Sequence, residues 1–143
     1  MPPIAKVDNQ PSSQLIDSLV RTSFAVTAVL SQVAAAHDMS LTQLRAMAVL
    51  RDREPKMAEL ASFLGLDRSS VSGLIDRAVA RGLVHRTTSN EDGRAIHVSL
   101  TPEGKRLGRE GAHEIAGLVS PMLRSLSPQD QDRLRVLLEK FLG

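Results

Sequence analysis

The chain has 143 residues, a formal net charge of +2, 42% hydrophobic residues and no cysteine. This length and composition fit one domain with a real core, and they exclude disulfides, thiolate metal sites and thiol-based redox sensing. The first residues lack the charged start and apolar core of a signal peptide, and no run approaches membrane-spanning length. The sequence therefore predicts a cytoplasmic protein without a membrane partner.

The first predicted element is a long helix over residues 12–37. Its apolar positions recur at helical spacing and form an unusually wide face, comprising Leu15, Ile16, Leu19, Val20, Phe24, Val26, Val29, Leu30 and Val33. A face of this width is broader than one neighbouring helix needs. It indicates a second contact surface on this helix.

Two shorter helices follow. Ser40 and Gln43 have the spacing of a capping box, which predicts a second helix from this point to about Asp52. Pro55 separates it from a third, short helix, which Gly65 ends.

A fourth helix begins at Arg68, where Asp67 is placed to accept from the backbone N–H of Ser70. Its apolar stripe comprises Val71, Leu74, Ile75, Ala78 and Val79. Gly82 suits the position just past its end. Since only "GLD" separates the third and fourth helices, residues from about 56 to 81 are predicted to form a helix-turn-helix.

The segments "LVHRTTS" and "AIHVSL" read as two strands joined by the polar "NEDGR", which predicts a hairpin, or wing, over residues 84–100. Thr101 caps a fifth helix that runs to about Arg124 with a bend at Pro121, and its four glycines weaken it. Ser127 caps a sixth helix with a stripe of leucines. The predicted class is mainly α with a small β-hairpin (α+β).

Residues 41–104 resemble the MarR family of bacterial transcriptional regulators. The matching features are "ELASFLGLDRSSVSGLIDRAVARGLVHR", the "D-x-R" of Asp92 and Arg94, and "VSLTPEG", in the family's order and spacing. The resemblance implies that residues 1–143 form a single MarR-like chain, with a winged helix-turn-helix DNA-binding domain over 41–100 and dimerisation helices over 12–37 and 102–143. It also implies a homodimeric repressor that binds a pseudo-palindromic operator in double-stranded DNA.

The same resemblance places the fourth helix in the major groove. Arg68, Ser69, Ser70 and Ser72 then become candidates for base edges and nearby phosphates, and Arg77 for a phosphate. Arg68 has the shape to contact guanine bidentately, whereas serine hydroxyls discriminate less among bases. Ser70 has a rival role as the partner of the helix cap, and a solvated helix face is the alternative for the whole set.

Further DNA contacts are expected from the hairpin. Arg86 is a candidate for a phosphate, whereas Arg81 is interpreted as a solvated side chain. Asp92 and Arg94 match the family's acidic and basic wing pair, in which the arginine lies at or near the minor groove. The alternative is that this pair only stabilises the hairpin turn, which is worth roughly 0–1 kcal/mol at a surface.

The sequence predicts no enzyme, no cofactor and no metal site. No catalytic motif brings Ser, His and Asp together. Among the histidines, at positions 37, 85, 97 and 113, no two lie four apart on one helix. His85 and His97 are expected to pack against each other across the hairpin.

A small organic effector is left open. Many members of the family bind small aromatic acids in a cleft between the dimer helices and the winged helix. Arg21, His37, Arg45 and His113 lie on segments placed to line such a cleft, but no motif supports any of them, so the effector-binding residues are unknown.

An alternative function is a winged helix used as a protein-interaction module without operator binding. Interaction surfaces usually expose apolar anchors, whereas the exposed face of the fourth helix is small and polar. The sequence therefore favours the DNA-binding regulator.

Overall fold

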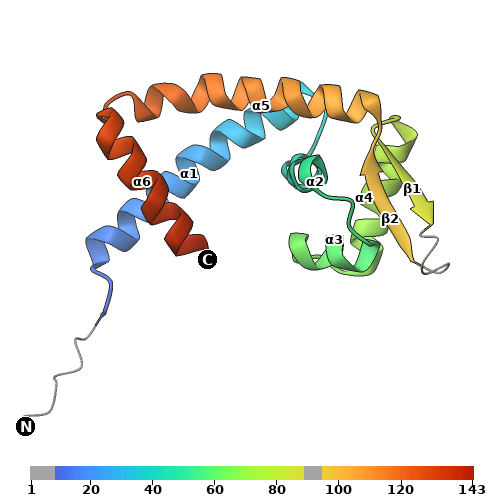
Figure 1. Ribbon diagram of the computed structural model, residues 1–143, viewed down its shortest axis with the longest axis horizontal. Helices are drawn as coiled ribbons and strands as arrows, with labels where there is room; N and C mark the ends of the chain where they lie inside the picture. Colours follow the sequence, from blue (N-terminus) through green and yellow to red (C-terminus); the bar gives the residue numbers. More distant parts are fainter. Residues whose placement is uncertain (1–8, 89–94) are drawn as a thin grey trace, which may run out of the picture.

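The computed structural model describes residues 9–88 and 95–143. The elements are α1 (Ser13–Ala36), α2 (Leu41–Asp52), α3 (Met57–Leu64), α4 (Arg68–Ala80), β1 (Val84–Thr88), β2 (Ile96–Leu100), α5 (Pro102–Leu123) and α6 (Pro128–Leu142). Figure 1 shows two parts: an arm made of α1, α5 and α6, and a winged-helix body made of α2, α3, α4 and the hairpin. The mainly helical class with one β-hairpin is confirmed.

The predicted helix starts are confirmed by their caps. Ser40 and Gln43 form the complete capping box, with each backbone N–H donating to the other side chain. The hydroxyls of Thr101 and Ser127 accept from the third residue of α5 and α6, respectively. Gly65 ends α3 with φ of 65°, a left-handed conformation that glycine adopts without steric cost.

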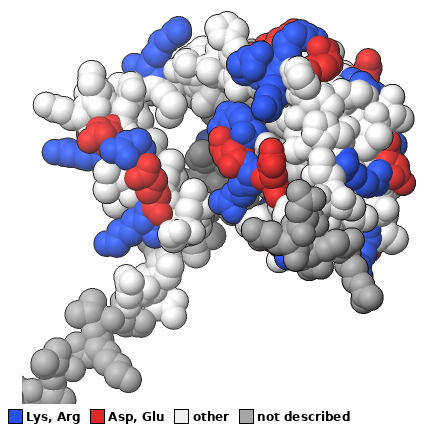
Figure 2. Space-filling model, turned by 45° about the vertical axis from the view of Figure 1, so that its right-hand side comes forward, with Lys and Arg blue, Asp and Glu red and all other residues white. Residues whose placement is uncertain are grey.

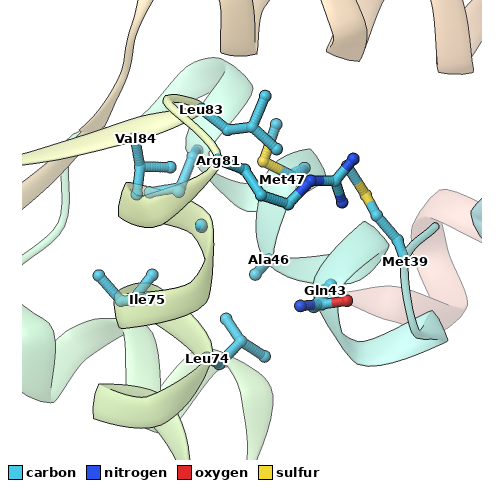
Figure 3. Close-up of a pocket in the computed structure, with 11 residues that line it drawn as sticks. Met39, Gln43, Ala46, Met47, Leu74, Ile75, Arg81, Leu83 and Val84 are labelled. Atoms are coloured by element: carbon cyan, nitrogen blue, oxygen red, sulfur yellow. The ribbon is translucent and has the colours of Figure 1, made fainter. Parts of the chain in front are cut away.

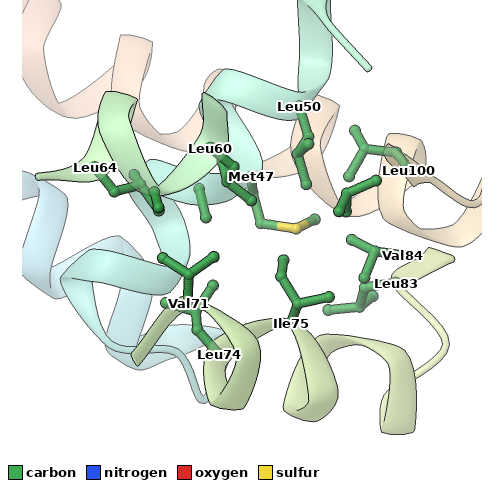
Figure 4. Close-up of a cluster of buried hydrophobic side chains, with 13 residues drawn as sticks. Met47, Leu50, Leu60, Leu64, Val71, Leu74, Ile75, Leu83, Val84 and Leu100 are labelled. Atoms are coloured by element: carbon green, nitrogen blue, oxygen red, sulfur yellow. The ribbon is translucent and has the colours of Figure 1, made fainter. Parts of the chain in front are cut away.

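The core of the winged-helix body lies between α2, α3, α4 and the hairpin (Figure 4). Leu60, Ile75 and Val98 are fully buried at its centre. Each side chain of this size stabilises the fold by roughly 1.5–3 kcal/mol when it is removed from water. The predicted apolar stripe of α4 supplies Val71, Leu74 and Ile75 to this core and turns the polar side of the helix outward, whereas Val79, at the far end of the stripe, is exposed.

The hairpin register differs from one expectation. β1 and β2 pair antiparallel, with His85 opposite Ser99 and His97 opposite Thr87. The Nδ1 atom of His97 lies 3.0 Å from the carbonyl oxygen of Glu54, in the segment before α3. His85 and His97 are therefore diagonal neighbours on one face of the hairpin and not directly opposite each other, because sequence spacing alone does not fix the strand register.

α5 starts in close contact with the hairpin. The backbone N–H of Thr101 donates to the carbonyl of Leu83 at 3.0 Å, and its hydroxyl donates to the carbonyl of Gly82 at 2.6 Å. A Cβ atom at Gly104 would lie only 2.0 Å from the Leu83 oxygen. This glycine was expected only to weaken the helix, but its missing side chain lets α5 approach the body closely.

The arm exposes large apolar surfaces in the single chain. α6 buries none of its residues in the described part of the chain. The exposed apolar side chains of the arm include Leu15, Ile16, Leu19, Val20 and Phe24 on α1, Leu118, Met122 and Leu123 on α5, and Val136, Leu137, Leu138, Phe141 and Leu142 on α6. We call this set the arm surface. It is consistent with the second contact surface that the width of the first helix indicated.

α1 also corrects an expectation about membrane-spanning runs. By length and composition alone, Ser13–Ala36 is long and apolar enough to cross a membrane. The expectation that no run approaches that length is therefore wrong. The sequence argument looked for an unbroken apolar run. The polar residues of this helix interrupt such a run, but most of them are uncharged and lower the mean hydropathy of the helix very little.

Candidate nucleic-acid interface

The first turn of α4 is fixed by a cap at Asp67. Its Oδ1 atom accepts from the backbone N–H of Ser70 at 2.8 Å and from the hydroxyl of Ser69 at 2.8 Å. These hydrogen bonds, first that of Ser70 and then that of Ser69, lower the pKa of the Asp67 carboxyl below its usual value. The predicted cap is confirmed, and the structure adds that Ser69 also belongs to it.

The four residues predicted to approach base edges are all exposed. Arg68, Ser69, Ser70 and Ser72 lie on the first turns of α4, on the side away from the core. Because Ser69 donates to Asp67, its hydroxyl keeps only its acceptor lone pairs for another partner. Arg68 and Ser72 have no such local restraint among the hydrogen bonds of the described residues.

Arg77 extends back along α4 toward this polar turn. Its Nη1 atom lies 3.5 Å from the place where a Cβ atom at Gly73 would stand. A residue four positions earlier on a helix lies on the same face, so Arg77 and the N-terminal turn share one surface. The missing side chain at Gly73 leaves room for the guanidinium there.

Arg86 is held by a neighbour that the sequence did not indicate. It sits on β1 opposite Val98, and its Nη2 atom forms an ion pair with Oδ1 of Asp76 on α4. The Arg86 side chain is 30% exposed and that of Asp76 is 64% exposed. The pair connects the hairpin to α4 and leaves part of the guanidinium open to solvent.

Arg81 is exposed to solvent, as the sequence indicated, but its guanidinium also makes two hydrogen bonds that the sequence did not reveal. From the C-cap of α4 it donates to the carbonyl of His37 at 2.8 Å and to that of Asp38 at 3.2 Å. Figure 3 shows its side chain reaching across toward Met39, above a small cavity of about 10 Å³. Arg81 therefore ties the end of α4 to the turn between α1 and α2.

The charges on the face of the molecule shown in Figure 2 are mixed. Figure 2 shows Lys and Arg side chains alternating with Asp and Glu rather than forming one continuous basic patch. The net charge of only +2 agrees with this distribution. Binding to a polyanion would therefore depend on the placement of individual arginines more than on a general positive field.

Asp92 and Arg94, the predicted wing pair, lie outside the described residues. Both interpretations of this pair remain predictions.

A cavity of about 380 Å³ lies between the arm and α2. Its lining is mostly apolar and comes from α1, α2 and α5, with His37, Arg45 and Arg51 among its polar residues. Of the four residues named for a cleft from the sequence, His37 and Arg45 line this cavity, whereas Arg21 and His113 are not in its lining.

Arg45 connects this cavity to the helix-turn-helix. Its guanidinium donates to the carbonyl oxygens of Phe63 at 3.2 Å and of Leu64 at 3.4 Å, at the C-terminal end of α3. These carbonyls lack intrahelical partners, so a cation is favourable there. The sequence did not reveal this contact, because α2 and α3 carry no motif that pairs these positions.

Comparisons with known proteins agree with this geometry. A family model described as MarR family matches residues 37–95. The chain is 30% identical over 110 residues to the HTH-type transcriptional repressor NicR of Pseudomonas putida, covering 74% of this chain and 70% of NicR. It is 33% identical over 96 residues to the HTH-type transcriptional regulator YfiV of Bacillus subtilis, covering 66% of this chain and 59% of YfiV.

A solved structure of NadR in complex with 4-hydroxyphenylacetate shares the fold. It superposes with a TM-score of 0.75 at 22% sequence identity, covering 93% of this chain and 94% of that one. One conclusion follows from the identity to NicR, the family-model match over the winged helix and the shared fold. This chain belongs to the MarR family of transcriptional regulators.

Proposed function

We propose that this protein is a homodimeric transcriptional repressor that binds a pseudo-palindromic operator through α4. The observation that carries the proposal is the first turn of α4, which is capped by Asp67 and presents Arg68, Ser69, Ser70 and Ser72 to solvent. Small hydroxyls and one guanidinium suit close approach to the base edges of a major groove. NicR, to which the chain is similar, is a repressor.

The arginines take different roles in this proposal. Arg68, at the first position of α4, contacts a guanine edge, and Arg77 contacts a phosphate beside the groove. Arg86 contacts a phosphate with the part of its guanidinium that Asp76 leaves open. Arg94, with Asp92 as its partner, approaches the minor groove.

The arm surface is the proposed dimer interface. It is too apolar to remain in water, and α6 finds no burial within its own chain among the described residues. A two-fold pairing of identical surfaces covers it on both chains and places two α4 helices on one DNA face. Their separation is expected to be roughly 34–36 Å, one turn of DNA. A protein acting on chromosomal DNA in this way works in the cytoplasm.

The cavity lined by Arg45 is the proposed site of a small organic effector. Its apolar walls suit a small hydrophobic body, and Arg45 and Arg51 suit an anionic group. An anion that pairs with Arg45 competes with the carbonyls of Phe63 and Leu64. Binding would thereby loosen the end of α3, directly before the turn that leads into α4. NadR has been solved with 4-hydroxyphenylacetate, a molecule of this chemical class.

The test combines light scattering with DNA binding. The purified chain should have the mass of two copies at micromolar concentration, and it should shift a DNA fragment that flanks its own gene at concentrations that leave scrambled DNA free. Removal of residues 1–36 should prevent assembly. A stable monomer, or equal binding of both DNAs by the folded protein, would contradict the proposal and favour a protein-interaction module.

A further inference from the structure

Three metal-ligating side chains meet where the end of α1 contacts α5. His37 is the C-cap of α1, and Glu110 and Glu114 lie one turn apart on α5. The Nε2 atom of His37 is 3.0 Å from Oε1 of Glu114. One ligand atom from each of the three residues lies within 4.8 Å of the other two.

We propose that His37, Glu110 and Glu114 bind one divalent transition-metal ion, with Zn²⁺ as the best fit. Zinc accepts imidazole nitrogen and carboxylate oxygen at about 2.0–2.2 Å, which places tetrahedral ligand atoms about 3.4 Å from one another. The ligand atoms now lie within 4.8 Å of one another, so Glu110 and Glu114 must draw together around the ion to reach that geometry. The three ligands leave a fourth position for water.

The electrostatics of the cluster favour a cation. Glu110 and Glu114 are spaced four residues apart, so their like charges repel each other on the same helix face. A divalent ion placed between them balances both charges. The His37 side chain is 14% exposed and that of Glu114 is 35% exposed, so the cluster is partly shielded from water and its charges interact more strongly than on an open surface.

Arg106 is the competing partner of Glu110, and it can release that carboxylate. Its Nη1 atom donates to Oε2 of Glu110 at 2.9 Å. The same guanidinium holds Glu103 through two further hydrogen bonds, of 2.9 and 2.6 Å. Arg106 therefore keeps a bidentate carboxylate partner when Glu110 turns toward a metal ion.

The position of the site gives it a connection to the recognition helix. The backbone carbonyl of His37 accepts the 2.8 Å hydrogen bond from Arg81, at the end of α4. His37 also lines the 380 Å³ cavity. An ion on its imidazole would fix the α1–α2 turn between these two features.

Cobalt titration of the full chain without an affinity tag tests the site. Bound Co²⁺ is followed by its visible absorption, and Zn²⁺ is then added to displace it. We expect saturation at one Co²⁺ per chain and loss of the signal with one equivalent of Zn²⁺. His113→Gln is the matched control, because His113 is an exposed histidine next to Glu114 that lies outside the cluster.

Glu110→Gln and Glu114→Gln should each weaken binding at least tenfold, while His113→Gln should bind as the parent does. Glu110 is exposed, so its variant keeps the test valid even if substitution of His37 impairs folding. No saturable absorption, or parental affinity in Glu110→Gln or Glu114→Gln, would overturn the proposal. The titration contains no DNA, and its result is therefore independent of the proposed repressor function.

Discussion

The role of Arg86 is tested by comparing Arg86→Ala with Asp76→Asn. Because both side chains of this pair are partly exposed, at 30% and 64%, the pair is a surface ion pair that contributes about 0–1 kcal/mol to folding. Neither side chain belongs to the buried core. Both variants are therefore expected to fold, and changes in DNA binding are not attributable to unfolding.

The size of the effect follows from counterion release. One lost phosphate contact lowers the slope of log K against log salt by about 0.9. Between 50 and 200 mM salt, a fourfold change, the parent should lose about 3.5-fold more affinity than Arg86→Ala. Operator and random DNA should show the same difference, since a phosphate carries no sequence information. Asp76→Asn should strengthen binding to both DNAs, because it removes the carboxylate that competes with the DNA phosphate for the Arg86 guanidinium.

Fluorescence anisotropy of labelled operator and scrambled duplexes over a salt series measures these slopes, with circular dichroism as the folding control. Parallel salt dependences for the parent and Arg86→Ala would refute the phosphate contact. The opposite outcome is that Asp76→Asn weakens DNA binding as much as Arg86→Ala, with no further loss of affinity in the double variant. In that case Arg86 would act only by holding the hairpin against α4.

Three further predictions follow from other parts of the structure. Arg68→Ala should cost about 1–3 kcal/mol at the operator and much less on random DNA, as measured by the same anisotropy assay. Gly104→Ala should destabilise the protein by about 1–3 kcal/mol in thermal or urea unfolding, because its Cβ meets the carbonyl of Leu83, whereas Gly108→Ala, one turn along, meets nothing and should be neutral or stabilising. Equal stability of these two variants would contradict the close approach. The lowered pKa of Asp67 stabilises the fold above the ordinary aspartate pKa, and this contribution is lost as the pH falls through the lower folded value. The melting-temperature advantage of the parent over Asp67→Asn should therefore shrink below about pH 4, and an advantage that is constant from neutral to acid pH would refute the role of the carboxylate.

The parts of the fold that the sequence predicted correctly depend on residues close together in the chain. The capping box of Ser40 and Gln43, the Asp67 cap and the left-handed Gly65 each involve partners within three or four residues. Such signals act before any tertiary contact forms, so they are visible without a structure. The polar first turn of α4 was visible for the same reason.

The contacts that the sequence did not reveal join residues far apart in the chain. Arg81 reaches a carbonyl 44 residues away, Arg45 one 18 residues away, and His37 meets a carboxylate 77 residues away. None of these pairs has a spacing that a helix or strand would impose. The expectation of no metal site considered the spacing of histidine pairs alone, so it did not weigh His37 together with two glutamates on another helix. The close approach of Gly104 to the backbone carbonyl of Leu83 also joins residues that are far apart in the chain.

If the cavity binds an effector as proposed, Arg45 and Arg81 are the two contacts through which that effector would change the position of α4. Arg45 extends from the cavity wall to the end of α3, and the short turn at Gly65 joins that end to the first turn of α4. Arg81 holds the opposite end of α4 to the α1–α2 turn. An effector that drew Arg45 away from these carbonyls, as proposed, would loosen the turn before the N-terminal end of α4 while Arg81 still holds its C-terminal end. The expected motion is a pivot about Arg81, which displaces the first turn, where Arg68 lies, more than any other part of the helix.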